Sequence, residues 1–257
     1  MNAPSLAFVV ALAQQAGELL RAGYARGSAI EIKGTYEIVT ETDRASEALI
    51  VAAIRERHPD HAILAEEGSG IEQPSAYRWA IDPLDGTNNF AHGVPFFSVS
   101  IALLHNDQPL LGVVFNPLSN ELFSAERGRG AFLGSQRLHV SETSALAASL
   151  LSTGFSYDYA ERTDNNLAEF DRLQACTQGV RRMGSAALDL CFVGAGRFAA
   201  HWEYRLSAWD SAAGALVVAE AGGQLSDLAG DDWSPASRTI VASNGHIHAP
   251  LLRALRG

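Results

Sequence analysis

The sequence has few cysteines, no excess of basic residues and no long uninterrupted apolar run. Its two cysteines, Cys176 and Cys191, stand in apolar or helical surroundings, so we expect buried free thiols and no disulfide. The formal net charge of −10 disfavours a nucleic-acid backbone as the main partner. No stretch reaches the ~18 apolar residues of a membrane span, and no basic segment precedes an apolar run at the N-terminus. These absences predict a cytoplasmic protein with neither a membrane nor a nucleic acid as partner.

The composition is that of a globular chain. Hydrophobic residues make up 47% of the 257 residues and charged residues 19%, which argues against a disordered protein. This length can form one large domain or two small ones around a substantial core.

The apolar periodicity differs between the two halves of the chain. In residues 1–140, helical spacing over residues 6–24 and a second helix expected to be capped by Thr42-Asp43 precede strands with period two, which predicts helices and a largely antiparallel sheet. Residues 141–257 alternate short strands with helices, which indicates an α/β layer. The helices are expected at residues 162–177, 185–194 and 211–221 and from His248 onward. No linker composition separates the halves, so we expect them to pack closely as one functional unit.

The most informative segment is the run from Trp79 to Phe90, in which an apolar strand ends in two carboxylates. Asp82 and Asp85 stand three residues apart, and the proline between them favours an extended backbone. Mg²⁺ prefers oxygen ligands, usually one or two carboxylates together with phosphate oxygens and water. Gly86 allows a close backbone approach, and a helical turn opening at Thr87 would present free N–H groups to a phosphate. Taken alone, the Asp-Gly pair could also be an ordinary surface turn.

Two further acidic sites occur in similar settings. Glu66 and Glu67 follow a short apolar run and precede a glycine, which predicts a strand end that feeds a loop. Asp210 stands at the start of a helix of small residues, where an aspartate commonly serves as an N-cap. Three strand-to-helix carboxylate sites in one chain favour a metal centre over three separate caps and turns.

These motifs together resemble the inositol monophosphatase family, within the lithium-sensitive, magnesium-dependent phosphatase superfamily. The resemblance extends from about Leu6 to about Leu252. It implies a five-layered αβαβα sandwich and a homodimer. The matching residues are Lys33, Val39–Asp43, Glu66-Glu67, Asp82–Phe90, Arg182–Ala187 and Trp209–Gly214.

The resemblance implies two or three Mg²⁺ ions in each site. A first ion would be held by Glu66, Asp82 and the Leu84 carbonyl, a second by Asp82, Asp85 and Asp210, and a third by Glu66 and waters. Most of these ligands lie in residues 1–140, and residues 141–257 would complete the site. A bridging Asp82 is physically reasonable, because two cations roughly 4 Å apart repel each other severely without a carboxylate between them.

The resemblance also implies direct attack by a water molecule that a metal ion activates. Thr87 and Asp43 would orient and deprotonate this water, and Glu66 could assist. Asp43 could equally be a helix N-cap, and both roles are compatible. The backbone N–H groups of Gly86 and Thr87 would hold phosphate oxygens.

Several residues are expected to contact the substrate. Glu203 matches the family carboxylate that binds polyol hydroxyls, with a solvated strand end as the alternative. Arg182 is expected either near the site or paired with an acid across a subunit interface. The other expected substrate contacts are Gly184, Ser185 and Ala186 of the sugar pocket, Asp210, and Lys33 near the outer phosphate.

The reaction most consistent with the resemblance is hydrolysis of inositol 1-phosphate, with inhibition by Li⁺. Fructose-1,6-bisphosphatase, histidinol-phosphatase and bisphosphate-nucleotidase activities on the same scaffold are alternatives, and residues 30–40 and 157–166 are expected to shape this choice. A metal-binding regulatory protein without turnover is a further alternative. A haloacid-type phosphatase is disfavoured, because no Asp-x-Asp pattern lies near the N-terminus.

Overall fold

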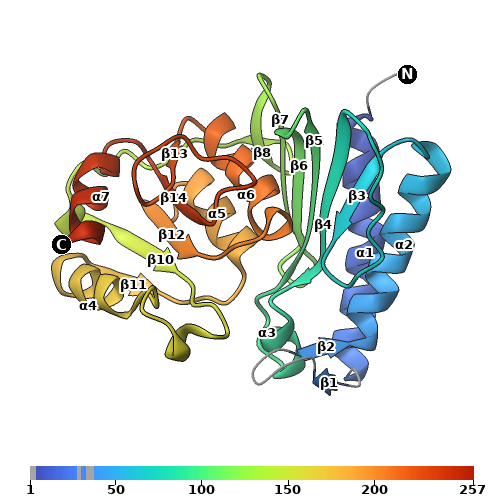
Figure 1. Cartoon of the computed structure of the whole chain (residues 1–257), viewed down its shortest axis with the longest axis horizontal. Coiled ribbons are helices and arrows are strands. Elements are labelled where there is room, and N and C mark those ends of the chain that lie inside the picture. The colour runs from blue at the N-terminus through green and yellow to red at the C-terminus, as the bar shows by residue number, and fades with distance from the viewer. Residues whose placement is uncertain (1–3, 28–29, 33–37) are drawn as a thin grey trace.

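The computed structural model describes residues 4–27, 30–32 and 38–257. Five layers alternate between helix and sheet (Figure 1): α1 and α2, a seven-stranded sheet, α5 and α6, a five-stranded sheet, and α4 with α7. The predicted αβαβα sandwich is therefore confirmed. No helix in the described ranges has the length and apolar character needed to cross a bilayer.

The first two layers come from the N-terminal half. Helices α1 (Leu6–Arg26) and α2 (Glu41–Arg57) pack on one face of the seven-stranded sheet. Its strands follow the order β3-β4-β5-β6-β7-β8-β9, and every neighbouring pair is antiparallel except the parallel pair β3 and β4. The strands are β3 (Ala62–Ala65), β4 (Tyr77–Asp85), β5 (Ser98–His105), β6 (Gln108–Asn116), β7 (Glu121–Glu126), β8 (Gly130–Leu133) and β9 (Gln136–Arg137). A separate antiparallel pair is formed by β1 (Ile30–Ile32) and β2 (Ile38–Thr40).

The remaining layers come from the C-terminal half. The five-stranded sheet has the order β11-β10-β12-β14-β13. Its strands β11, β10 and β12 are parallel, whereas β14 is antiparallel to β12 and β13. The strands are β10 (Leu150–Thr153), β11 (Gly179–Arg181), β12 (Ala200–Tyr204), β13 (Gln224–Ser226) and β14 (Thr239–Ser243). The helices are α4 (Leu167–Cys176), α5 (Ala186–Gly194), α6 (Ala208–Glu220) and α7 (His248–Arg256), with 3-10 turns at Leu146–Ala148 and Tyr159–Glu161.

Four apolar cores fill the four gaps between the five layers. The alternation of strand side chains supplies them: Trp79 and Ile81 of β4 belong to the core under α1 and α2, while Ala80 belongs to the core under α5 and α6. In the same way, Trp202 of β12 packs toward the outer α4 and α7 layer. Fully buried side chains such as Ile50 each contribute substantially, since truncating one to alanine costs about 2–5 kcal/mol.

Small residues allow the middle helices to approach their neighbours closely. A Cβ atom added at Gly214 of α6 would lie 2.6 Å from the Leu190 Cβ atom of α5, and one added at Gly112 of β6 would lie 2.9 Å from the Ala213 carbonyl oxygen. Both distances are shorter than ordinary van der Waals contact. The small-residue composition of α6 therefore has a packing reason.

The structure corrects several local predictions. The second helix begins at Glu41 with Thr40 as its N-cap, and Asp43 is the third helical residue of a capping box. The small-residue helix begins at Ala208, so Asp210 is likewise not the N-cap. The helix predicted over residues 162–177 begins only at Leu167. Cys176 is exposed rather than buried, although both cysteines are free thiols.

Candidate active site

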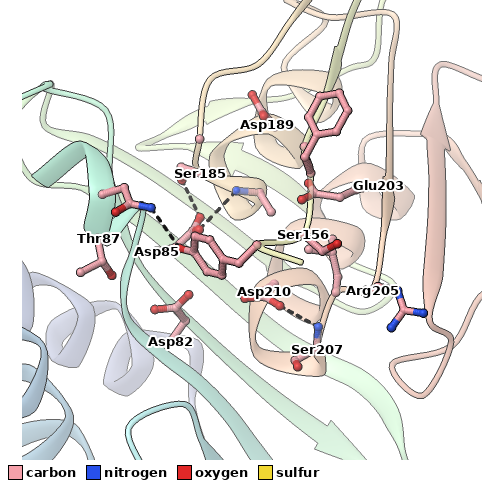
Figure 2. A pocket seen from close by; sticks show the side chains of 18 of the residues that line it. Asp82, Asp85, Thr87, Ser156, Ser185, Asp189, Glu203, Arg205, Ser207 and Asp210 are labelled. Atoms are coloured by element: carbon pink, nitrogen blue, oxygen red, sulfur yellow. Dashed lines mark hydrogen bonds between the residues drawn. The ribbon is translucent and has the colours of Figure 1, made fainter. Parts of the chain in front are cut away.

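One pocket lies where the two halves of the chain meet. It has a volume of about 250 Å³ and is lined from the N-terminal half by Glu66, the end of β4 and the start of α3 (Thr87–Ala91). From the C-terminal half it is lined by the segment before α5, by α5 itself, by the end of β12 and by the start of α6. Figure 2 shows Asp82, Asp85 and Asp210 turned toward the same space. The structure thus brings together acids that lie far apart in the sequence.

The acids in this pocket raise each other's pKa. The pKa of Asp82 is well above its usual range because the group is buried and because Glu66, Asp85 and Asp210 lie nearby. Burial also raises the pKa of Asp85 to about 6. The pKa of Asp210 is raised by burial and then by Asp85 and Glu66. A divalent cation would relieve this repulsion, so the set of hard carboxylate oxygens fits Mg²⁺ in kind.

Among the described residues, these acids are not arranged as a closed metal coordination shell. Within the described residues, no group of three or more His, Cys, Asp or Glu side chains forms a ready-made metal site. Individual acids instead make local contacts: Asp82 Oδ1 accepts a hydrogen bond of 2.9 Å from the Leu84 N–H, and Asp210 Oδ2 accepts one of 2.6 Å from the Ser207 N–H. The metal roles of Glu66, Asp82, Leu84, Asp85 and Asp210 stay predictions.

Asp85 joins the two halves of the molecule. Its Oδ2 atom accepts hydrogen bonds from the Ser185 hydroxyl (2.5 Å) and the Ala187 N–H (2.9 Å), and its Oδ1 atom accepts one from the Ala186 N–H (3.3 Å). These donors stand at the N-terminus of α5, where the backbone N–H groups have no partner within the helix. Gly184, Ser185 and Ala186 do line the pocket as predicted, but the donors of Ser185 and Ala186 are directed at Asp85.

Thr87 and Asp43 form the predicted hydroxyl–carboxylate pair. The Thr87 hydroxyl lies 3.1 Å from Asp43 Oδ1 and 3.0 Å from the Leu84 carbonyl oxygen. Asp43 Oδ2 accepts hydrogen bonds from the Thr40 N–H (2.9 Å) and hydroxyl (2.5 Å). Burial raises the pKa of Asp43, and the bonds from Thr40 and Thr87 partly oppose this. Thr87 lines the pocket, whereas Asp43 is fully buried behind it.

Gly86 lies at one of the close contacts between the two halves. Its φ of +98° lies in the left-handed region, and an added Cβ atom would lie 3.0 Å from the Gly184 carbonyl oxygen and 3.1 Å from that of Phe96. Nearby, the Asn89 amide donates to the carbonyls of Phe96 (2.7 Å) and Met183 (2.8 Å). The contact therefore requires glycine. The binding of phosphate by the Gly86 and Thr87 N–H groups stays a prediction.

Two buried polar residues of α2, not singled out from the sequence, hold the acidic loops. Glu47 is fully buried and accepts hydrogen bonds from the N–H groups of Glu67 (2.7 Å) and Ser69 (2.8 Å). Ser46 donates to the Pro83 carbonyl at 3.0 Å. The sequence does hold a signal for them, because Asp43, Ser46 and Glu47 share helical spacing with the buried Ile50. Polar residues on the apolar face of a helix require partners.

Glu203 lies in the pocket wall and is 9% exposed, which argues against a solvated strand end. Strand alternation places it and His201 on the face opposite Trp202. A Cβ atom added at Gly154 would lie only 2.0 Å from Glu203 Oε1, so the carboxylate rests directly on that backbone. Its Oε2 atom lies 3.3 Å from His201 Nε2, and His201 Nδ1 lies 3.0 Å from the Ser152 hydroxyl. Contact of Glu203 with substrate stays a prediction.

The outer rim of the pocket contains cationic and aromatic residues. Arg182, Tyr157 and Arg205 line it. The Arg205 Nη2 atom lies 2.9 Å from Asp164 Oδ2, which links β12 to the segment 157–166. Arg205 has a φ of +64°, an uncommon conformation for a residue with a side chain. Lys33, predicted at the outer phosphate, lies outside the described residues, as does the centre of the predicted loop over residues 30–39.

The geometry agrees with comparisons with known proteins. Residues 1–257 match the inositol monophosphatase family.

The chain belongs to the inositol monophosphatase family.

Relatives in this family bear different names. A Nus factor SuhB of Pseudomonas aeruginosa is 45% identical over 98% of this chain and 96% of its own length. An inositol-1-monophosphatase of Synechocystis sp. is 50% identical over 85% of this chain and 77% of its own. The solved inositol monophosphatase of Anabaena (Nostoc) sp. superposes with a TM-score of 0.90 at 44% identity, covering 98% of this chain and 94% of its own. Membership in the family supports phosphatase activity and dependence on Mg²⁺, but these names do not single out one substrate.

Proposed function

We propose that the chain hydrolyses the phosphate monoester of a polyol, with inositol 1-phosphate as the favoured substrate. The observation that carries the proposal is the convergence of Asp82, Asp85, Asp210 and Thr87 in one pocket, with Asp43 buried behind it in contact with the Thr87 hydroxyl. Glu66, Asp82, the Leu84 carbonyl, Asp85 and Asp210 would hold two or three Mg²⁺ ions. Bound Mg²⁺ supplies the positive charge that neutralises a phosphate group and makes water more acidic.

The chain's own residues would direct the proton of the attacking water. Thr87 Oγ1 can accept this proton while passing its own to Asp43 Oδ1, 3.1 Å away. Asp43 suits this role, because burial raises the pKa of its carboxyl group and the Thr40 donors fix its other oxygen. The hydroxyl–carboxylate pair would thus act as one general base.

The other wall of the pocket would bind the polyol. The Glu203 carboxylate can accept hydrogen bonds from the hydroxyl groups of the leaving alcohol. The name of the Synechocystis relative, inositol-1-monophosphatase, supports a polyol phosphate. Fructose 1,6-bisphosphate and histidinol phosphate are alternative substrates for the same chemistry.

A regulatory role without turnover is the second candidate, favoured by relatives named Nus factor SuhB. Those names also leave the predicted lack of a nucleic-acid partner untested. The completeness of the predicted site, with the acids Glu66, Asp82, Asp85 and Asp210 and the hydroxyl residue Thr87 all present, favours the enzyme. The homodimer and the cytoplasmic location stay predictions.

Phosphate release with Mg²⁺ tests this proposal. The panel contains inositol 1-phosphate, fructose 1,6-bisphosphate, histidinol phosphate and 3′-phosphoadenosine 5′-phosphate, each with and without Li⁺. We expect inositol 1-phosphate to give the highest kcat/KM and Li⁺ to inhibit. Preference for another ester would overturn the substrate but keep the chemistry. Absence of release from every ester, with Mg²⁺ still bound in a calorimetric titration, would favour the regulatory role.

A further inference from the structure

One acid in the pocket has no role in the proposed reaction. Asp189 lies in the first turn of α5, is only 1% exposed, and lines the same pocket as Glu203 and Asp85. Among the described residues, its Oδ1 atom is buried and has no hydrogen-bond partner. The structure therefore presents an unused acceptor inside the site.

The fold itself gains little from this carboxylate. The remaining residues of α5 are apolar or small, and burying an unpartnered polar group costs about 1–3 kcal/mol. Burial raises the pKa of Asp189 well above its usual range, Glu203 and Asp85 raise it further, and Arg182 opposes them. A leucine of similar size would suit the surrounding core better. A partner from outside the chain would explain the acid.

The position of Asp189 points to the alcohol half of the substrate. Figure 2 shows Asp189 and Glu203 on one side of the pocket, with Asp82, Asp85 and Asp210 on the other. Phosphate would lie with the metal-binding acids, so the leaving alcohol would face the first pair. Two neighbouring carboxylates accept hydrogen bonds and repel anions. They would favour an alcohol with donor groups over one that is bare or carries a second anion.

We propose that Asp189 is a second specificity residue, which accepts a hydrogen bond through Oδ1 from a hydroxyl or ammonium group on the alcohol half of the phosphate ester. This inference rests on the proposed function. It differs from it in assigning recognition to a residue of α5 in addition to Glu203.

The test compares Asp189→Leu and Asp189→Asn with the wild type on three esters. Inositol 1-phosphate offers hydroxyl donors, histidinol phosphate offers an ammonium group, and phenyl phosphate offers no donor on its alcohol half. For Asp189→Leu we expect kcat/KM to fall about tenfold or more on whichever of the two donor-bearing esters the wild type recognises, mainly through a higher KM. On phenyl phosphate we expect kcat/KM to fall less than about twofold. Asp189→Asn keeps an acceptor oxygen but loses the negative charge. It should therefore retain most activity if Asp189 recognises a hydroxyl group, and lose activity if Asp189 recognises an ammonium group. Asp171→Leu, at an exposed site on α4, is the matched control.

Each result decides between roles. An equal fall on all three esters, or no fall on any, overturns the inference and leaves the phosphatase activity intact. If the wild type hydrolyses no ester, the proposed function fails, and binding of free inositol is measured instead. Millimolar inositol should then raise the melting temperature of the wild type and not that of Asp189→Leu. An equal shift for both proteins, or none for either, would also overturn the inference.

Discussion

The two halves of the molecule differ in how the polar groups at the pocket are held by hydrogen bonds within the chain. In the N-terminal half, polar side chains of α2 hold the site: Glu47 binds the loop after Glu66, and Ser46 binds the Pro83 carbonyl. In the C-terminal half, Asp189 Oδ1 has no hydrogen-bond partner among the described residues, and the Glu203 carboxylate lies 3.3 Å from His201 Nε2 and against the Gly154 backbone. The pocket wall from the N-terminal half, here called the fixed wall, is held by hydrogen bonds within the chain. The wall from the C-terminal half, here called the open wall, has acceptor groups that a ligand can bind.

This difference suggests a division of labour. A reaction that depends on metal ions requires fixed oxygen positions, since catalytic geometry must hold to within a fraction of an ångström. Selection among alcohols instead requires acceptors that become satisfied only when the correct substrate binds. The N-terminal half would then set the chemistry, and the C-terminal half would set the substrate.

The largest effect is expected where both halves meet. Asp85→Asn should lower kcat on every phosphate ester by on the order of 10³-fold, because a neutral amide cannot stabilise the cations and the charge that develops. The fold should persist, since the asparagine oxygen can still accept from the Ala187 N–H. Phosphate release and a thermal melt measure both quantities. Asp107→Asn, in the exposed turn between β5 and β6, is the control, and near-normal turnover in Asp85→Asn would contradict the two-metal assignment.

Glu47→Gln tests whether the fixed wall supports catalysis, because Glu47 itself does not line the pocket. The amide has one acceptor oxygen for two backbone N–H groups, so the loop that carries Glu66 should shift. We expect the Mg²⁺ concentration needed for half-maximal activity to rise about 10–100-fold, equally for all esters. Glu56→Gln, exposed on the same helix, should change nothing. A loss that differs between esters would show that this wall also selects substrates.

The pH dependence of stability tests the repulsion among the acids. The folded-state pKa of Asp85, about 6, lies above the ordinary value of 3.8, so the folded protein binds the extra proton between these values. Its contribution to stability is therefore present at low pH and lost as pH rises through about 6. The melting temperature of the metal-free wild type, measured relative to Asp85→Asn, should be higher at pH 5 than at pH 7.5 by a few °C.

Magnesium should act in the same direction as protons. At pH 7.5, saturating Mg²⁺ should raise the melting temperature of the wild type more than that of Asp85→Asn. A difference between the two proteins that stays constant with both pH and Mg²⁺ would show that Asp85 does not share a site with the other acids.

The smallest effect is expected at the open wall's rim. Arg205→Gly and Arg205→Ala both remove the exposed pair with Asp164, worth at most ~1 kcal/mol, but only glycine tolerates the φ of +64° without strain. Glycine should therefore be more stable than alanine by about 1 kcal/mol, or roughly 2–4 °C in melting temperature. Equal melting temperatures would show that the backbone relaxes in the alanine variant. Turnover of phenyl phosphate should change less than about twofold in either variant.

Periodicity predicted the kinds of element in each half, because strand alternation and helical spacing are local patterns: helices with a largely antiparallel sheet in the first half, and strands alternating with helices in the second. The stacking of these elements in five layers came from the family resemblance. The starts of α2 and α6 were misplaced by about three residues for a physical reason. In a capping box, the hydroxyl residue and the acid three positions later both bind the helix terminus. Asp43 and Asp210 are the acids of two such boxes, and the N-cap positions that the sequence left open for them belong to Thr40 and Ser207.

The site was predictable as far as its motifs extend. Asp82 and Asp85 stand in one short segment at the end of β4, and the structure places them in the pocket. The contacts of Asp85 with Ser185 and Ala187 join residues about 100 positions apart, and no local sequence pattern predicts them. Asp189 was not singled out from the sequence, although it is the acid of an otherwise apolar or small-residue helix. The position of such a residue in the pocket becomes apparent only when the layers are packed together in the structure.

The bonds between Asp85 and the start of α5 also bear on how the protein is made. The acids of the N-terminal half leave the ribosome first, whereas α5 and then Asp210 follow later. Until those segments dock, Asp85 lacks its hydrogen-bond donors and the pocket lacks one wall. A chain whose synthesis has not passed α6 therefore carries an incomplete site, so activity at this site requires that both halves have been made and have docked.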